Sequence, residues 1–436
     1  MATRLANVLV AFALSSLARA HAATDVPVEA WHAIAAPRWE GIAAGPGRYE
    51  LGGDVVRAFL DPARYAGGWL RARASASADM PDFNVWITGL DEKMMVRQRS
   101  LPSTCRVADG RKTCSNVSWI APGSPRLAVT FWSGGNGALD PGPIESARGG
   151  DIAPANERRW RELADAIQDL YLDGDAVDWP RVRDASHALL AAPPDIDPLP
   201  AAIAALIRSL PDNRHMAIVR RPGTGSPGDA APLPTCTAGS DGAWVLALPG
   251  TPRDADAHAR YRASAHACLA TPGVRHWRVD LTQDNGGDAR LQLAALQPIL
   301  GTGPQLKFRD AHGALVVVAL QPTAVTVGGV VQDRWATPQP PVHADVTFVI
   351  GPGCASACEE VALAARGRFR LVGQPTAGLT SVNEPREIND ALMVQITSAK
   401  AVDLQDRAFE RIEPDEPLAA WAVAALLRPP ASSPAP

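Results

Sequence analysis

The sequence predicts an α/β protein whose C-terminal half forms a sheet covered by helices. Two observations lead to this prediction. From Gly242 onward, short aliphatic or β-branched runs alternate with helical segments. The runs are also almost continuously apolar, as is typical of strands that are buried on both faces of an α/β sheet. The expected strands are GAWVLALPG, HWRVDLT, ALVVVAL, VTFVIG and FRLVGQ, and the expected helices are Asp254 to Leu269, Asp288 to Leu300 and Ser356 to Arg366.

Two further regions precede this core. Short alternating runs such as FNVWITGL and RLAVTFWSGG predict a β-rich domain of unknown role at 24–150. Apolar residues at helical spacing, beginning with Trp160 and Leu163, predict a helical subdomain at 151–225. A linker rich in Pro and Gly then leads to the core, which is expected at 240–425. The tail 426–436 is expected to be disordered.

The N-terminus, residues 1–23, resembles a secretory signal. Arg4 precedes an apolar run that ends at Leu17, and small residues follow it. The run is short for a membrane span, so we expect a cleaved signal peptide rather than a stable membrane anchor. The mature protein is therefore expected to be periplasmic or secreted.

Composition narrows the class of partner. The formal net charge is −4 with a pI near 6.2, and the arginines are interspersed with acidic residues. Nucleic acid is therefore not an expected partner, whereas a protein or peptide substrate is. No histidine lies at ligand spacing near the cysteines, so no zinc site is expected there. No other feature of the sequence implies a metal or an organic cofactor.

Six cysteines suit an oxidising compartment. Cys105 and Cys114 bracket a short polar loop and form the first expected disulfide, and Cys236 with Cys268 is the next. A bridge between Cys354 and Cys358 is geometrically marginal because the two residues are so close in sequence. Pairing of these two with Cys236 or Cys268 stays open.

Three stretches could carry chemistry. In GPGCASACEE a turn after a buried strand leads into a helix near Ser356, which suits either a nucleophile or an ordinary helix cap. In DLTQDNGG the paired Gly286 and Gly287 follow another strand and could expose amides to a bound carbonyl. In LPDNRH the candidate general base is His215, with His187, His276 and His343 as competing histidines.

Taken together, these stretches resemble a family. The segment from about Asn156 to about Leu418 is similar to the serine peptidases of the C-terminal processing (tail-specific) and tricorn-core superfamily, which includes interphotoreceptor retinoid-binding protein modules. That resemblance implies a ClpP/crotonase-like sheet. The motifs that carry it occur in the family's order: DNRH, DLTQDNGG, SACE, VGQPTAG and ERIEPD.

The resemblance also implies roles for individual residues. Ser356 would be the nucleophile and His215 the base, with Glu410 as the supporting carboxylate. Ala357 and one of Gly286 or Gly287 would supply the amides of the oxyanion hole.

The sequence departs from the family pattern at several positions. Leu379 stands where tail-specific members carry a lysine base, which favours the His-dependent branch. Arg214 replaces the small hydroxyl residue that precedes the histidine in tricorn-like enzymes. The late motif is short, so Asp406 rivals Glu410. The chain between His215 and Gly242 is too short for the PDZ domain that many members carry there.

The sequence thus predicts a secreted serine endopeptidase that acts through an acyl-enzyme. The alternative is a non-catalytic module that binds a ligand or peptide on the same fold.

Overall fold

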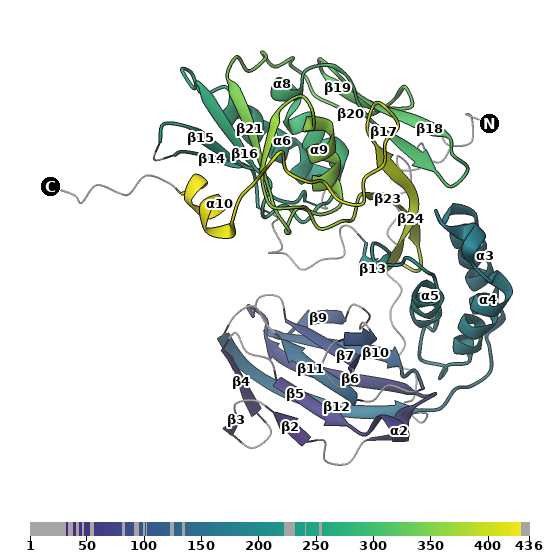
Figure 1. Cartoon of the computed structure of the whole chain (residues 1–436). Helices are drawn as coiled ribbons and strands as arrows, with labels where there is room; N and C mark the ends of the chain where they lie inside the picture. Colours follow the sequence, from purple (N-terminus) through teal and green to yellow (C-terminus); the bar gives the residue numbers. More distant parts are fainter. Residues whose placement is uncertain are drawn as a thin grey trace.

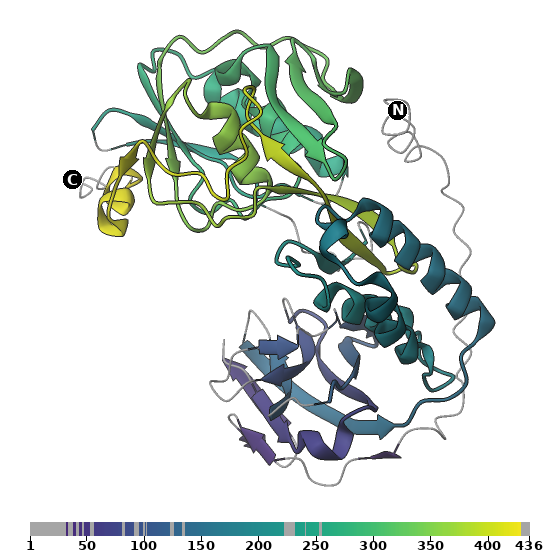
Figure 2. The same cartoon turned by 45° about the vertical axis from the view of Figure 1, so that its right-hand side comes forward.

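The computed structural model describes residues 56–428 and short strands between 32 and 52, with gaps at 53–55, 81–82, 91–95, 99–100, 102, 123–125, 133–135, 222–231, 240 and 253–254. The predicted signal peptide and the tail from residue 429 lie outside the described residues. The described residues form a mixed α/β structure, which confirms the predicted fold class. Figures 1 and 2 show a β-sandwich at one end, helices α3 to α5 in the middle and the α/β core at the other end.

The N-terminal part is a pair of packed antiparallel sheets. One sheet has the order β3-β4-β12-β6-β10-β9, with β1 also on β12, and the other has the order β2-β5-β11-β7-β8. Every second residue of β6 from Ala72 to Ala76 is buried and packs toward the other sheet. The elements are β1 (His32–Ala33), β2 (Arg38–Glu40), β3 (Ala43–Gly45), β4 (Arg48–Gly52), β5 (Val56–Leu60), α2 (Pro62–Tyr65), β6 (Trp69–Ser77), β7 (Asn84–Leu90), β8 (Val96–Gln98), β9 (Thr104–Ala108), β10 (Arg111–Trp119), β11 (Arg126–Trp132) and β12 (Asn136–Ala147).

The helical part joins the sandwich to the core. Its helices are α3 (Pro154–Leu170), α4 (Trp179–His187) and α5 (Leu199–Arg208), with single 3-10 turns at Gly174–Ala176 and Ala188–Leu190. Each of the three α-helices has a proline in its first two positions, where the missing N–H costs nothing. Their apolar faces share one core cluster with Trp69 of the sandwich and with Val394 and Ile396 of the core.

The first sheet of the core is parallel except for its edge strand β14. Its order is β14-β15-β16-β21-β22-β25. Alternate residues such as Trp277, Val279 and Phe348 face helices α6, α7 and α9. The opposite face carries Arg278, whose Nη1 donates to Leu426 O of α10 (3.0 Å). The elements are β14 (Thr235–Ala238), β15 (Trp244–Ala247), α6 (Ala255–Leu269), β16 (His276–Asp280), α7 (Ala289–Ala295), α8 (Gln297–Leu300), β21 (Asp345–Ile350), α9 (Ala357–Ala365), β22 (Arg370–Gly373), β25 (Glu416–Pro417) and α10 (Ala420–Leu426).

The second sheet of the core is antiparallel, with the order β13-β24-β17-β18-β19-β20 and with β23 also on β24. The predicted strand ALVVVAL is here, as β18, and not in the parallel sheet. Its connections to β17 and β19 are short turns, which permit only antiparallel neighbours. The strands are β13 (Ala217–Arg220), β17 (Gly303–Asp310), β18 (Leu315–Gln321), β19 (Ala324–Val327), β20 (Val330–Arg334), β23 (Ser381–Glu387) and β24 (Leu392–Val402).

None of the helices that the structure describes is long and apolar enough to span a bilayer.

Candidate active site

The candidate site is built from turns that follow neighbouring parallel strands. β15, β16 and β21 lie side by side and run in the same direction, so the turns after them reach the same edge of the sheet. Open α/β sheets bind ligands at this edge. The turn after β16 carries Gly286 and Gly287, and the turn after β21 leads to Ser356.

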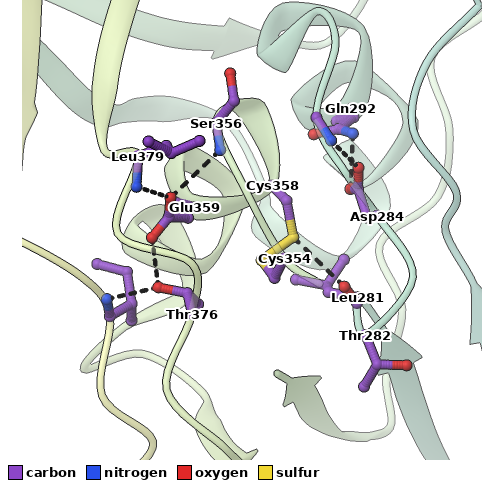
Figure 3. Close-up of a disulfide and its surroundings, with 12 residues drawn as sticks. Leu281, Thr282, Asp284, Gln292, Cys354, Ser356, Cys358, Glu359, Thr376 and Leu379 are labelled. Carbon is purple, nitrogen blue, oxygen red and sulfur yellow. Dashed lines mark hydrogen bonds between the residues drawn. A yellow bond between two sulfur atoms is a disulfide. The ribbon is translucent and has the colours of Figure 1, made fainter. Parts of the chain in front are cut away.

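Ser356 has an unusual backbone conformation. It directly precedes α9 and has φ 59° and ψ −120°. A positive φ is rare for a residue with a Cβ and costs about 1–3 kcal/mol. Figure 3 shows its side chain pointing away from Glu359 and from the Cys354–Cys358 disulfide. The fold thus holds a half-buried hydroxyl at the positive end of a helix dipole, in a conformation that the turn imposes.

Gly286 lies directly against Ser356. A Cβ on Gly286 would lie 2.9 Å from Ser356 Cβ and 2.8 Å from Ala355 O, and its φ is 105°. Any side chain here would push the two turns apart or strain the backbone. The DNGG and SACE motifs therefore meet in space, as the resemblance implies.

The amides of these turns differ in their partners. Gly286 N–H donates to Asp284 Oδ1 at 2.9 Å, so it is already engaged. Within the described part of the chain, the N–H groups of Gly287 and Ala357 have no hydrogen-bond acceptor. Ala357 is buried, so its amide without an acceptor calls for an explanation, and a bound oxyanion would provide one. Gly287 is exposed, so its amide is accessible to a ligand.

Asp284 supports the glycine turn from behind. Its carboxylate is fully buried, and Oδ2 accepts a hydrogen bond from Gln292 Nε2 at 2.7 Å. Burial raises the pKa of Asp284 from 3.8 to about 7, although the hydrogen bonds from Gly286 and Gln292 oppose this shift. Its backbone carbonyl also accepts from Ala355 N–H at 3.2 Å, which ties the glycine turn to the serine turn.

Replacing Asp284 with asparagine should change how stability depends on pH. Between about pH 4 and about pH 7 the folded protein holds a proton on Asp284 that the unfolded chain has lost. The unfolding free energy of the wild type therefore falls as the pH rises through this window. The unfolding free energy of Asp284→Asn minus that of the wild type should therefore rise by more than about 1 kcal/mol between those two pH values. Urea unfolding at a series of pH values measures this difference.

The exposed Asp345→Asn is the control for loss of one carboxyl group. If the unfolding free energies of the wild type and Asp284→Asn differed by the same amount at every pH, the raised pKa of Asp284 would be contradicted.

A disulfide closes the serine turn. Cys354 and Cys358 are bonded to each other, with their Cα atoms 5.3 Å apart and both side chains buried. Cys105–Cys114 links directly opposed residues of β9 and β10, and Cys236–Cys268 links β14 to the end of α6. The marginal pairing is therefore the one found, because the chain reverses between the end of the strand and the first turn of α9. With both cysteines bonded, Ser356 is the candidate nucleophile that this turn leaves available.

Glu359 joins the serine turn to the next one. Its buried carboxylate accepts hydrogen bonds from Ser356 N–H (3.3 Å), from Gly378 N–H (2.9 Å) and from Leu379 N–H. It also accepts from the Thr376 hydroxyl. Figure 3 shows this carboxylate between Ser356 and Leu379. The VGQPTAG motif is thus fixed next to the nucleophile candidate by one carboxylate.

His215 is held at the end of that same turn. Its Nδ1 lies 2.8 Å from Ser381 Oγ, and its backbone carbonyl accepts from Asn383 Nδ2 at 2.8 Å. Burial lowers the pKa of His215 from 6.5 to about 4. Bonding to the backbone of Ser381 and the charge of Asp212 oppose the shift, and the charge of Lys400 adds to it. The imidazole is therefore neutral, as a general base must be, at neutral pH.

A series of contacts links Ser356 to His215 through Glu359, Leu379 and Ser381, although no hydrogen bond joins the two side chains among the described residues. Leu379 and Ser356 share one carboxylate, and two residues of chain from Leu379 span at most about 7 Å. Catalytic hydrogen bonds are often long in an unliganded enzyme and shorten when the substrate binds.

The two candidate carboxylates lie apart from the His215 ring. Glu410 is exposed, and its backbone carbonyl lies near Gly378. The hydrogen bond and charge of Asp212 are the main causes that raise the pKa of Arg214, and the charge of Glu410 adds the least. Asp406 forms an ion pair with Lys307, with Oδ1 to Nζ at 2.7 Å. Among the described residues, neither carboxylate is hydrogen-bonded to His215.

No pattern in the sequence indicates a role for Ser381 or Asp284, and Glu359 is marked only as a member of the SACE motif. The sequence signal for Glu359 was its position in SACE, but the roles of the other two depend on contacts that only the fold creates. No group of three or more metal-binding side chains is found in the parts of the chain that the structure describes.

The chain is similar to several known proteins. The model of peptidase family S41 matches residues 256–418. A lipoprotein from Streptococcus agalactiae has 17% identity and a TM-score of 0.52, covering 63% of this chain and 97% of its own. The photosystem II D1 C-terminal processing protease has 15% identity and a TM-score of 0.30 (47% and 48% covered). The tricorn protease has 10% identity and a TM-score of 0.31 (84% and 43% covered). No curated protein gives a significant sequence match.

Residues 256–418 thus match the model of the peptidase family that the motif resemblance implied. The similarity to the lipoprotein, at 17% identity, shows a shared fold.

Proposed function

We propose that this protein is a serine peptidase that hydrolyses peptide bonds through an acyl-enzyme. The observation that carries the proposal is the position of Ser356. The residue is held at a positive φ at the carboxyl edge of the parallel sheet, directly against Gly286, and within the described residues the N–H groups of Gly287 and Ala357 have no acceptor. A strained turn between a strand and a helix that presents a hydroxyl next to free amides is the arrangement that acyl transfer requires.

In the proposed reaction, Ser356 Oγ attacks the scissile carbonyl carbon while its proton moves to His215 Nε2. The oxyanion that forms accepts hydrogen bonds from the N–H groups of Gly287 and Ala357. Collapse of the intermediate breaks the C–N bond, and His215 returns the proton to the leaving amine. Water then repeats the sequence on the ester and releases the new carboxyl group. Of the two glycines, Gly287 is the proposed donor because Gly286 already donates to Asp284.

Glu410 is the proposed supporting carboxylate, and it would act at a distance through its negative charge rather than through a hydrogen bond to His215. It is exposed and influences Arg214, the neighbour of His215. Asp406 is a weaker candidate because its carboxylate is paired with Lys307.

The proposed location is outside the cytoplasm, in the periplasm or secreted. The N-terminal sequence pattern and the three disulfides support this proposal.

Hydrolysis of an unstructured protein tests the proposed reaction. Incubation of β-casein with the purified protein, without reductant, should yield peptides with new carboxyl termini. With hydroxylamine present, part of each new terminus should become a hydroxamate, because an acyl-enzyme reacts with any small nucleophile. Mass spectrometry of the products distinguishes peptides that end in a hydroxamate from peptides that end in a carboxyl group. Cleavage without any hydroxamate would contradict the acyl-enzyme, and a folded protein that cleaves nothing would favour the binding module.

A further inference from the structure

The imidazole of His215 meets a hydroxyl where a carboxylate was expected. Nδ1 lies 2.8 Å from Ser381 Oγ, and neither Glu410 nor Asp406 is hydrogen-bonded to the ring among the described residues. The contact joins residues 166 positions apart in the sequence. Ser381 is the first residue of β23 and is partly buried.

We propose that Ser381 is the residue that positions His215 for catalysis, by accepting a hydrogen bond from Nδ1–H so that Nε2 is left free to take the proton of Ser356. This inference rests on the proposed function. Ser381 touches neither the substrate nor the reacting atoms, so it acts through His215.

The surrounding strands fix this geometry at a second point. Asn383, two residues along β23, donates to His215 O, and its Oδ1 accepts from Thr397 Oγ1 of β24 at 3.0 Å. The register between β23 and β24 shifts between Val382 and Asn383, so the two contacts lie on either side of an irregularity in the sheet. β23 therefore holds the histidine backbone with Asn383 and the histidine ring with Ser381.

The same segment also contacts the nucleophile turn. Gly378 and Leu379 donate to Glu359, which in turn accepts from Ser356 N–H. Residues 376–381 thus bind the serine turn at one end and the imidazole at the other. A hydroxyl in this place sets the position of the base relative to the nucleophile, which the exposed Glu410 cannot do from its present place.

Charged groups act on the His215 ring, and the neutral ring can adopt either of two tautomers. Asp212 and Lys400 act on His215 with opposite signs, and Arg214 is engaged with Asp212 (Nε to Oδ1, 3.0 Å). Among the described residues no carboxylate is hydrogen-bonded to the ring, and the partner of Nδ1 is Ser381. Its hydroxyl accepts from Nδ1–H in the proposed arrangement. When the imidazolium forms during attack, Nδ1–H donates to Ser381 Oγ. A hydrogen bond from a charged donor is stronger than one from a neutral donor.

Nitrogen NMR of His215 tests the assignment without relying on activity. The protein is labelled with ¹⁵N-histidine, and the signals that His215→Ala removes identify the residue. In the wild type near pH 7, we expect the neutral tautomer that is protonated at Nδ1. In Ser381→Ala, the population should shift toward the tautomer that is protonated at Nε2. Ser381→Thr, which keeps the hydroxyl on a strand residue, should restore the wild-type spectrum.

Kinetics provide the second readout. Ser381→Ala should lower kcat about tenfold to a hundredfold with little change in KM, because the lost interaction strengthens in the transition state. Ser381→Thr should recover most of the rate. Ser398→Ala, on the neighbouring strand β24, is the matched control and should be close to the wild type.

The outcomes separate this inference from the proposed function. Suppose that the wild type is inactive, that its His215 is protonated at Nδ1, and that the tautomer shifts in Ser381→Ala. This result would refute the peptidase but support the contact between His215 and Ser381. An active wild type whose tautomer or kcat is unchanged in Ser381→Ala overturns the positioning role and leaves the peptidase intact. A wild type protonated at Nε2 also overturns it.

Discussion

Replacing Ser356 with alanine is expected to lower kcat for peptide hydrolysis by roughly 10⁴- to 10⁶-fold. The reason is that the hydroxyl is the proposed attacking group, and the remaining amides of Gly287 and Ala357 give only residual catalysis without it. The measurement is the steady-state rate on a fluorogenic peptide derived from a cleaved site. Near-normal turnover by a folded Ser356→Ala variant would assign the nucleophile elsewhere.

Ser356→Gly is the matched variant for the backbone. Glycine accepts a positive φ without penalty, whereas Ser356 holds φ 59° at a cost. Ser356→Gly should therefore be as inactive as Ser356→Ala but more stable than it by about 1 kcal/mol or more in urea unfolding. Equal stability of the two variants would show that the turn stores no strain at this residue.

His215→Ala is expected to have the second-largest effect, a loss in kcat of roughly 10⁴-fold or more. The pH profile makes the assignment specific. Because burial lowers the pKa of His215 to about 4, kcat/KM of the wild type should rise with pH through about 4 and be flat by pH 6. An unperturbed histidine would place this limb near 6.5.

His312→Ala is the control for loss of a histidine, because His312 is exposed in the turn between β17 and β18. It should leave the rate and the pH profile unchanged. A wild-type limb near 6.5, or a His215→Ala variant as active as His312→Ala, would exclude His215 as the base.

The local signals in the sequence predicted the elements of the core well. The end of β21, the turn and the start of α9 around Ser356 appear where apolar runs, turn residues and a helical segment predict them. The strand β18 was predicted, but its expected place in the same sheet as β16 and β21 was wrong. A continuous apolar run looks the same in a parallel and in an antiparallel sheet. Its short turns decided the pairing.

The supporting contacts of the site were beyond the sequence. Ser381 is a hydroxyl residue at the start of a strand, which has no distinctive pattern, and its partner lies 166 residues away. In the sequence Asp284 is an ordinary turn residue. In the fold it is buried and bonded to Gln292, and burial raises its pKa. Glu410 was assigned from a motif, but the turn that carries it leaves its side chain exposed. Positions set by tertiary contacts do not appear in local patterns.

The most direct test of the central claim is covalent labelling by a fluorophosphonate probe, followed by mass spectrometry of the labelled peptide. The folded wild type, with its disulfides intact, should be labelled on Ser356, and Ser356→Ala should not be labelled. His312→Ala should be labelled like the wild type. A folded wild type that is not labelled, or that carries the label on another residue, would contradict an activated serine at this turn.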